Sequence, residues 1–184
     1  SIDPKQFMKI FIEWTKDILE KKTGKKISID GKAIKSATDK INNGNIPYIV
    51  SAFIGEIGLS IGEVKVDDKS NEITAIPELL DLLDIEGATI TIDAIGTQED
   101  IVNKIVNKGG HYVLPVKDNQ RILKKEIKSQ FDSYNNLLGN PEVFHKSTVD
   151  KDHGRIEERE YYLTYNTSKI TDKEKWNTVN AVAY

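Results

Sequence analysis

The sequence contains no cysteine, which excludes a disulfide framework and any metal site built on thiolates. It also lacks a long apolar run. The most apolar stretch, Pro47 to Gly62, carries Glu56 and three glycines, so it is a poor candidate for a membrane span. Nothing at the N-terminus resembles a signal peptide. The sequence therefore predicts a protein of the reducing cytoplasm that has no membrane partner.

An excess of charge of one sign is also missing, because 26 Lys and Arg nearly balance 29 Asp and Glu, for a net charge of −3. That balance argues against a dedicated nucleic-acid binder, whose affinity for phosphate comes largely from Lys and Arg. The distribution is uneven, however. Residues 21–40 hold seven Lys against two Asp (+5), residues 102–130 hold six Lys and one Arg against two acids (+5), and residues 67–100 hold ten acids against one Lys (−9). The chain has either a basic face or a mixed solvated surface.

One tetrapeptide pattern occurs twice, as Ile-Ser-Ile-Asp at residues 27–30 and as Ile-Thr-Ile-Asp at residues 90–93. Each copy reads as a β-strand with two Ile on one face and Ser or Thr plus Asp on the other. If the two strands are neighbours in a parallel sheet, Asp30 and Asp93 emerge at the same edge, where open α/β sheets usually place their ligand sites. A single Asp at a strand end is also common as a turn former.

The surrounding patterns predict the element order β-β-β-α-β-α-β-α within one globular unit of 184 residues. The expected segments are a lead-in helix (4–21), three strands (27–30, 48–54 and 59–66), a helix after Pro77, a strand (90–93), a helix ending at Gly109, a strand (111–116) and a helix after Asp118. Residues 132–154 read as a connection or insertion, and residues 155–165 read as a further strand.

Several local features accompany this order. The lead-in helix has an apolar face at Phe7, Phe11, Trp14 and Ile18. A hairpin turn is expected at 55–58, and a change of apolar parity predicts a β-bulge at Gly62. Thr97 and Asp100 resemble a capping box for a helix that buries Ile101, Val102, Ile105 and Val106, and Asp118 is expected to cap the last helix, which buries Leu123, Ile127 and Gln130/Phe131.

Two carboxylates that converge at one sheet edge repel each other unless a cation or a proton lies between them. Hard cations such as Mg²⁺ and Mn²⁺ prefer oxygen ligands, and carboxylates from different strands can hold two such ions for phosphodiester chemistry. Asp30 and Asp93 fit that role, and their separation in sequence matches a strand, a hairpin, a helix and a returning strand.

Five segments, in order, resemble an insertion-sequence transposase of the DDE superfamily, in the group of H-repeat-associated proteins. The segments are ISIDGK (27–32), NEITAIPELL (71–80), TIDAIGTQ (91–98), GGHYVLPVKDNQ (109–120) and HGRIEER (153–159). The resemblance implies a ribonuclease H-like α/β fold, in which a mixed sheet of three consecutive strands and then βα units is flanked by helices.

The resemblance also implies a domain plan and partners. It divides the chain into a helical lead-in (1–26), a ribonuclease H-like catalytic core (27–131) and an insertion or strand region (132–184) that stops before the catalytic domain is complete. The implied activity is transposition, with DNA at transposon ends and target as partner, a two-metal Mg²⁺ or Mn²⁺ site, and two protomers that bridge two DNA ends.

By this resemblance Asp30 and Asp93 are metal ligands and the first two acidic residues of the catalytic triad. The third, a Glu, lies in the family on a later helix in a Trp-x-Ile-Glu context, which we expect beyond Tyr184, so the chain alone is expected to be inactive. Glu157 is the candidate within the chain. Because Arg155, Glu157 and Arg159 would share one strand face, an ion-pair ladder is the favoured interpretation of this segment.

Other side chains are candidates for contact with DNA. The proposed phosphate contacts are Lys32, Lys117, Arg155 and Arg159. For the two lysines the alternative is simple solvation. Tyr161, Tyr162 and Tyr165 could stack on bases, although packing on a core is the commoner role of strand aromatics.

Two functions from other classes compete with an active transposase core. One is a catalytically inactive remnant that acts at most as a DNA-binding module. The other is a receiver-like signalling domain, because Asp93 and Lys117 at successive strand ends resemble a phosphoacceptor and its lysine. The hairpin at residues 48–66 argues against the receiver, whose helices and strands alternate from the start.

Overall fold

The structure is a computed structural model that describes residues 3–19, 24–34, 48–66, 72–134, 137–152 and 154–184. The chain forms two compact units, Ser1–Pro115 and Val116–Tyr184. The predicted polar connection at residues 42–45 lies outside the described residues. Within the described residues no helix is long and apolar enough to cross a membrane.

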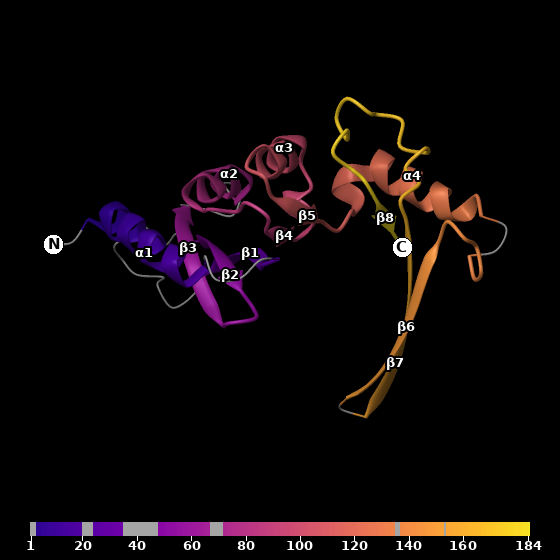
Figure 1. Cartoon of the computed structure of the whole chain (residues 1–184), viewed down its shortest axis with the longest axis horizontal. Helices are drawn as coiled ribbons and strands as arrows, with labels where there is room; N and C mark the ends of the chain where they lie inside the picture. The colour runs from indigo at the N-terminus through magenta and orange to yellow at the C-terminus, as the bar shows by residue number, and fades with distance from the viewer. Residues whose placement is uncertain (1–2, 20–23, 35–47, 67–71, 135–136, 153) are drawn as a thin grey trace. The chain divides into compact units, whose positions relative to one another are not determined.

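The first unit is built on a mixed five-stranded sheet in the order β3-β2-β1-β4-β5 (Figure 1). β1 pairs antiparallel with β2, and β2 with β3, whereas β1–β4 and β4–β5 are parallel. The strands are β1 (Lys26–Ala33), β2 (Tyr48–Ile54), β3 (Leu59–Val66), β4 (Thr89–Ile92) and β5 (His111–Val113). Three antiparallel strands followed by parallel βα units make a ribonuclease H-like fold, which confirms the predicted fold class.

Helices cover one face of this sheet. α2 (Glu72–Leu82) and α3 (Glu99–Asn107) connect β3 to β4 and β4 to β5. Their buried Leu79, Leu80, Ile101 and Ile105 belong to the same core cluster as the isoleucines of β1 and β4. The predicted alternation therefore holds, because Ile27, Ile29, Ile90 and Ile92 are buried beneath the helices while Ser28 and Asp30 are exposed on the other face.

The predicted bulge lies beside Gly62. In the β2–β3 ladder Ala52 pairs with Gly62 but Phe53 pairs with Ser60, so Ile61 is the extra residue. A Cβ on Gly62 would be 3.1 Å from a methyl of Leu83 and 3.2 Å from a methyl of Leu79. The absence of a side chain at Gly62 thus lets α2 pack closely on β3.

The lead-in helix α1 (Pro4–Leu19) packs on β3, but not through the face expected from the sequence. Ile12 and Thr15 are buried, whereas Phe7 is 54% exposed and Trp14 is 57% exposed. The rings of Phe7, Phe11 and Trp14 instead contact one another along the outer side of the helix, with centroids 6.3 and 6.0 Å apart. The side chain of Ile18 lies outside the described residues.

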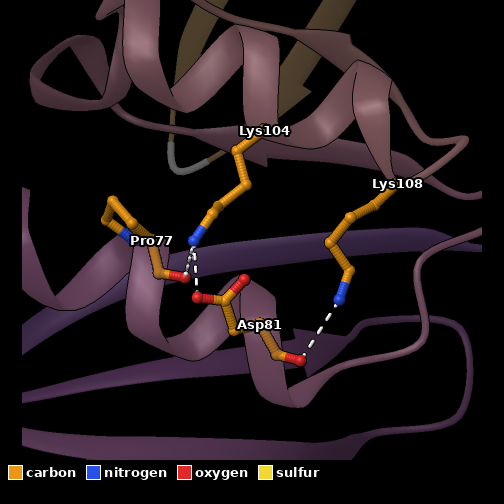
Figure 2. A network of polar contacts seen from close by, with 4 residues as sticks. All are labelled: Pro77, Asp81, Lys104 and Lys108. Carbon is orange, nitrogen blue, oxygen red and sulfur yellow. Dashed lines mark hydrogen bonds and ion pairs between the residues drawn. The ribbon is translucent and has the colours of Figure 1, made fainter.

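Lys104 of α3 and Lys108, the residue that follows α3, bind the C-terminal half of α2 (Figure 2). Lys104 Nζ donates to the carbonyl of Pro77 at 3.1 Å and to the Asp81 carboxylate at 2.5 Å, and Lys108 Nζ donates to the carbonyl of Asp81 at 3.2 Å. Cations near a helix C-terminus also interact favourably with its dipole. α2 begins at Glu72, earlier than the predicted start, so that Pro77 lies inside the helix and removes one backbone donor.

Three local predictions in this unit are wrong or incomplete. The N-cap position of α3 is Gln98 rather than Thr97, whose hydroxyl donates to the carbonyl of Pro115 at 2.8 Å. Val106 is exposed rather than buried. β5 ends at Val113, earlier than expected, and Pro115 follows. The stop of α3 at Gly109 is confirmed by its positive φ of 74°.

The second unit contains α4 (Arg121–Asp132) and a three-stranded sheet in the order β6-β7-β8. The strands are β6 (Phe144–Asp152), β7 (Arg155–Thr164) and β8 (Val182–Ala183), so much of the segment predicted as a connection is a strand. β6 and β7 form a long antiparallel ribbon (Figure 1). Leu123, Gln130 and Phe131 are buried as predicted, and Ile127 is half-buried.

Asp118 does not cap α4. It begins the short 3-10 helix η5 (Asp118–Gln120), and its carboxylate accepts from Lys124 Nζ at 2.9 Å. That hydrogen bond lowers the pKa of the Asp118 carboxyl. The predicted strand at 155–165 is confirmed by β7.

Replacement of Leu79 by Ala should destabilise the first unit, because the fully buried Leu79 packs between α2 and the sheet. We expect a loss of about 2–5 kcal/mol in the free energy of unfolding, measured by urea denaturation. Ile73→Ala, at a position 39% exposed on the same helix, should cost less than about 1 kcal/mol. Equal costs for the two variants would contradict this packing.

Lys104→Met retains most of the apolar stem but removes the ammonium that joins α3 to Pro77 and Asp81. Since Asp81 is largely solvated, we expect a loss of only about 0.5–1 kcal/mol in the free energy of unfolding. High salt should shrink the difference from the unsubstituted protein. Lys65→Met, at an exposed position of β3, is the control, and an effect of Lys104→Met no larger than that control would count against the network.

Candidate functional site

The candidate site begins with Asp30 and Asp93. The parallel β1–β4 ladder pairs Ser28 with Thr91 and Ile29 with Ile92, so Asp30 and Asp93 occupy the next position on neighbouring strands. Asp93 directly follows β4 and keeps an extended backbone, with φ −66° and ψ −179°. Because neighbouring strands are about 4.8 Å apart, the two residues lie side by side at the carboxyl end of both strands.

A hydrogen bond shows which face the two carboxylates share. Thr91 Oγ1 donates to Ser28 Oγ at 3.0 Å, which places these two side chains together on the face away from the helices. Side chains two residues along a strand lie on the same face, so Asp30 and Asp93 follow Ser28 and Thr91 on that face. Both aspartates are exposed. The structure therefore brings the two predicted acidic residues together.

The turn after β4 holds the Asp93 side chain in place. Its Oδ1 accepts the backbone N–H of Ile95 at 3.0 Å and so caps the 3-10 helix η4 (Ala94–Gly96). A Cβ on Gly96 would be 2.5 Å from Ile92 Cγ2, so glycine is required for this tight return over the strand. One carboxylate oxygen is thus engaged by the backbone, and Oδ2 can point to a ligand.

Three further side chains share the face of Asp30. Lys32 is two residues along β1 and exposed, as the phosphate-contact hypothesis requires. Ser51 of β2 pairs with Asp30, and Glu63 of β3 pairs with Ser51. A polar row of Glu63, Ser51 and Asp30 therefore crosses three strands and continues to Asp93, directly after β4. Sequence reasoning did not select Glu63, because on its own it reads as the solvated side of an edge strand.

The chemistry of these donors fits a divalent cation. Two carboxylates on adjacent parallel strands offer hard oxygen ligands and repel each other when no cation is bound. Among the described residues, no group of three or more His, Cys, Asp or Glu side chains gathers as a metal site. Asp30 and Asp93 are thus the pair that could hold a metal ion at this edge, with its remaining ligands from elsewhere.

The other predicted site residues lie in the second unit. Lys117 directly precedes η5, and Arg155, Glu157 and Arg159 lie on β7. Arg159 forms an ion pair with Glu157 and has an Nη1 atom 3.8 Å from Asp150 Oδ2. Hydrogen bonds with Tyr161 and Glu157 raise the pKa of the Arg159 guanidinium further. This arrangement is the one expected for an ion-pair ladder, and the roles of all four residues remain predictions.

The tyrosines of this segment are in different environments. Tyr162 stacks on His145 with ring centroids 5.0 Å apart, and its hydroxyl donates to Glu160 at 3.4 Å. Partial desolvation and the Glu160 charge raise the pKa of Tyr162. Tyr161 and Tyr165 are exposed, but Tyr161 hydrogen-bonds with Arg159 and the ring of Tyr165 contacts Phe144 edge-on at 5.7 Å. All three tyrosines thus have contacts within the ribbon, and stacking on bases stays a prediction.

Glu72 is a residue near the site that sequence reasoning did not select. It is the first residue of α2 and is 8% exposed, and its carboxylate lies against Gly31, the residue after Asp30. A glutamate at the start of a helix is normally solvated, so the local sequence does not predict that Glu72 is buried. A signal was present in Gly31, since a glycine inside a strand often marks the close approach of another group.

Comparisons with known proteins identify the family. The model of the transposase DDE domain matches residues 22–179. "Putative transposase YncI" of Escherichia coli O157:H7 is 43% identical over 174 residues, which are 95% of this chain and 44% of that protein. "H repeat-associated putative transposase YhhI" of E. coli K12 is 42% identical over 158 residues, covering 86% of this chain and 41% of that protein.

Two more distant proteins are also similar. "Uncharacterized protein in dhlA 3'region" of Xanthobacter autotrophicus is 35% identical over 181 residues, with 95% of this chain and 58% of that protein covered. The cryo-EM structure of the piggyBac transposase synaptic complex with hairpin DNA shares 12% identity at a TM-score of 0.42, with 77% of this chain and 30% of that chain covered.

This chain spans about two-fifths of the length of YncI from the O157:H7 strain and of YhhI. The family model covers most of the chain, and it includes both strands that carry the paired aspartates. The chain belongs to the transposase DDE domain family.

Proposed function

We propose that this chain is part of the catalytic domain of a DNA transposase and that Asp30 and Asp93 hold divalent metal at its active site. The observation that carries the proposal is the pairing of β1 with β4, which puts both carboxylates on one face and at one edge of the sheet. Family membership supplies the reaction class, which is phosphodiester cleavage at transposon ends and strand transfer to target DNA.

In the proposed reaction a water molecule attacks the phosphorus at the element's end, which breaks the P–O3′ bond and leaves a 5′-phosphate and a free 3′-hydroxyl. This 3′-hydroxyl then attacks a phosphorus of the target DNA and displaces the 3′-oxygen of the target strand as a hydroxyl. Two Mg²⁺ or Mn²⁺ ions, when bound, would stabilise the attacking and leaving oxygens. Asp30 and Asp93 would supply their carboxylate ligands. The backbone N–H of Ile95 keeps the Asp93 carboxylate oriented before any ligand arrives.

Basic residues of both units would bind the DNA backbone. Lys32 shares the face of Asp30 and would contact a phosphate next to the reacting one. Lys117 and Arg155 would add contacts from the second unit, whereas Arg159 would first have to exchange its carboxylate partners for phosphate. Two protomers would bridge two DNA ends.

The third acidic ligand is Glu157 or a Glu beyond Tyr184. Engagement of Glu157 with Arg159 favours the second choice, so we expect this chain alone to bind metal weakly and not to cleave DNA. An inactive DNA-binding remnant is the alternative if the longer protein also lacks that residue. The receiver-like alternative is disfavoured because β1, β2 and β3 pair antiparallel.

Mn²⁺ should bind at the edge formed by Asp30 and Asp93. In NMR spectra of this chain, substoichiometric Mn²⁺ should broaden the amide signals of residues 28–33 and 91–96 before others. Asp30→Asn or Asp93→Asn should raise the Mn²⁺ concentration needed by about tenfold, because each removes one of two anionic ligands. Asp100→Asn, exposed on α3, is the control. Unaltered broadening in both site variants would refute this metal site.

Asp93→Asn in the longer protein that contains this chain should abolish DNA cleavage, with a loss of at least about a thousandfold in rate. The melting temperature should stay within about 2 °C, because an Asn side chain can still accept the N–H of Ile95 and cap η4. Cleavage of a labelled transposon-end duplex in Mg²⁺ measures the effect, again with Asp100→Asn as control. Full cleavage by the Asp93 variant would end the assignment.

A further inference from the structure

Glu72 is a buried carboxylate beside the strand end that carries Asp30. It begins α2, and only 8% of its surface is exposed, although the rest of the first turn of that helix includes the exposed Ile73 and Thr74. Burial of a carboxylate is unfavourable unless polar groups and charges compensate for it. The positive end of the α2 dipole is one such compensation, because Glu72 occupies the first turn.

The carboxylate of Glu72 rests on the backbone of Gly31. A Cβ added to Gly31 would lie 2.3 Å from Glu72 Oε1, 2.6 Å from Cδ and 3.2 Å from Oε2. The near contact is with the carboxylate group itself, at the end of the Glu72 side chain. A side chain at position 31 would therefore force the Glu72 carboxylate out of this place.

The contact lies directly behind Asp30. Gly31 follows Asp30 in β1, and successive residues of a strand face opposite sides of the sheet. Glu72 is therefore on the helix-covered face, one residue from the carboxylate that we propose as a metal ligand on the open face. Segments 27–32 and 71–80, two of those that carry the family resemblance, meet at this point.

Glu72 is not a third member of the metal site in this structure, because the described residues contain no group of three potential ligands. Its effect on the site has to pass through β1. A side chain packed against Gly31 limits the movement of the peptide units on either side, and the first of these belongs to Asp30. When ionised, its carboxylate also adds negative charge near the sheet edge, which favours a cation there.

We propose that Glu72 is a positioning residue of the Asp30–Asp93 site, fixing the carboxyl end of β1 through Gly31 and raising the affinity of that edge for a divalent cation. This inference rests on the proposed metal function. The inference has a positional part, that Glu72 fixes the backbone of β1, and a charge part, that Glu72 raises the affinity for a cation. The two can be tested separately, because the positional part holds whether or not a cation is bound.

The charge part is tested with Glu72→Gln, which keeps the size of the side chain and removes its charge. The Mn²⁺ titration followed by amide broadening at residues 28–33 and 91–96 should shift to about three- to tenfold higher Mn²⁺. Glu78→Gln, exposed on the same helix, removes a charge of the same sign and should leave the titration unchanged. A Glu72→Gln titration identical to that of Glu78→Gln would overturn the charge part.

The positional part is tested by amide hydrogen exchange without metal. Glu72→Ala should speed exchange of Gly31 and Lys32 by about tenfold or more, with little change at Ile90 in the neighbouring strand, whereas a general loss of stability would speed all three. Glu72→Asp, which is shorter by one methylene and withdraws the carboxylate from Gly31, serves if the Ala variant does not fold. Unchanged exchange at Gly31 and Lys32 in the variant that folds would overturn this part.

The combined results distinguish the two proposals. If the unsubstituted chain shows no Mn²⁺ broadening at residues 28–33 and 91–96, the proposed metal site fails, the affinity claim for Glu72 fails with it, and the exchange data alone decide the positional claim. If broadening is present, lost in Asp30→Asn and unaffected by Glu72→Gln, the metal site stands and Glu72 has no part in cation binding.

Discussion

The parallel pairing of β1 with β4 is the contact on which both the core and the site depend. In this register Ile27 lies beside Ile90 and Ile29 beside Ile92, and all four are buried under the helices. Because strand side chains alternate, the same register sends the intervening polar residues to the open face. A slip of one residue would bury carboxylates and expose isoleucines, so hydrophobic burial specifies the register and thereby the site.

The two aspartates therefore cost the well-packed sheet little stability. Neither aspartate is buried, so solvent weakens the repulsion between the two negative charges, and the Ile95 N–H stabilises the carboxylate of Asp93. What the fold supplies is register, since the β1–β4 pairing puts the two aspartates at neighbouring positions of adjacent strands. Among the described residues, no group of three or more potential metal ligands gathers there.

The strands and the bulge could be predicted from the sequence because they depend on the local alternation of apolar and polar residues. The repeated Ile-Asp pattern predicted the two central strands, and the parity change at Gly62 predicted the bulge. Features that depend on contacts distant in sequence were not readable. Thr97 donates to the carbonyl of Pro115, which lies 18 residues along the chain, and does not occupy the N-cap position. Helix α1 packs on β3 through Ile12, so its aromatic side chains stay largely exposed. The burial of Glu72 belongs to the same class.

The contact of Glu72 with Gly31 links the side chains that these two positions can hold. A Cβ at position 31 would meet the Glu72 carboxylate, so a substitution at either position changes the space available at the other. The effects of substitutions at positions 31 and 72 on stability are therefore not additive, because the two residues are in contact. A tolerated change at position 31 depends on how far the side chain at position 72 can give way.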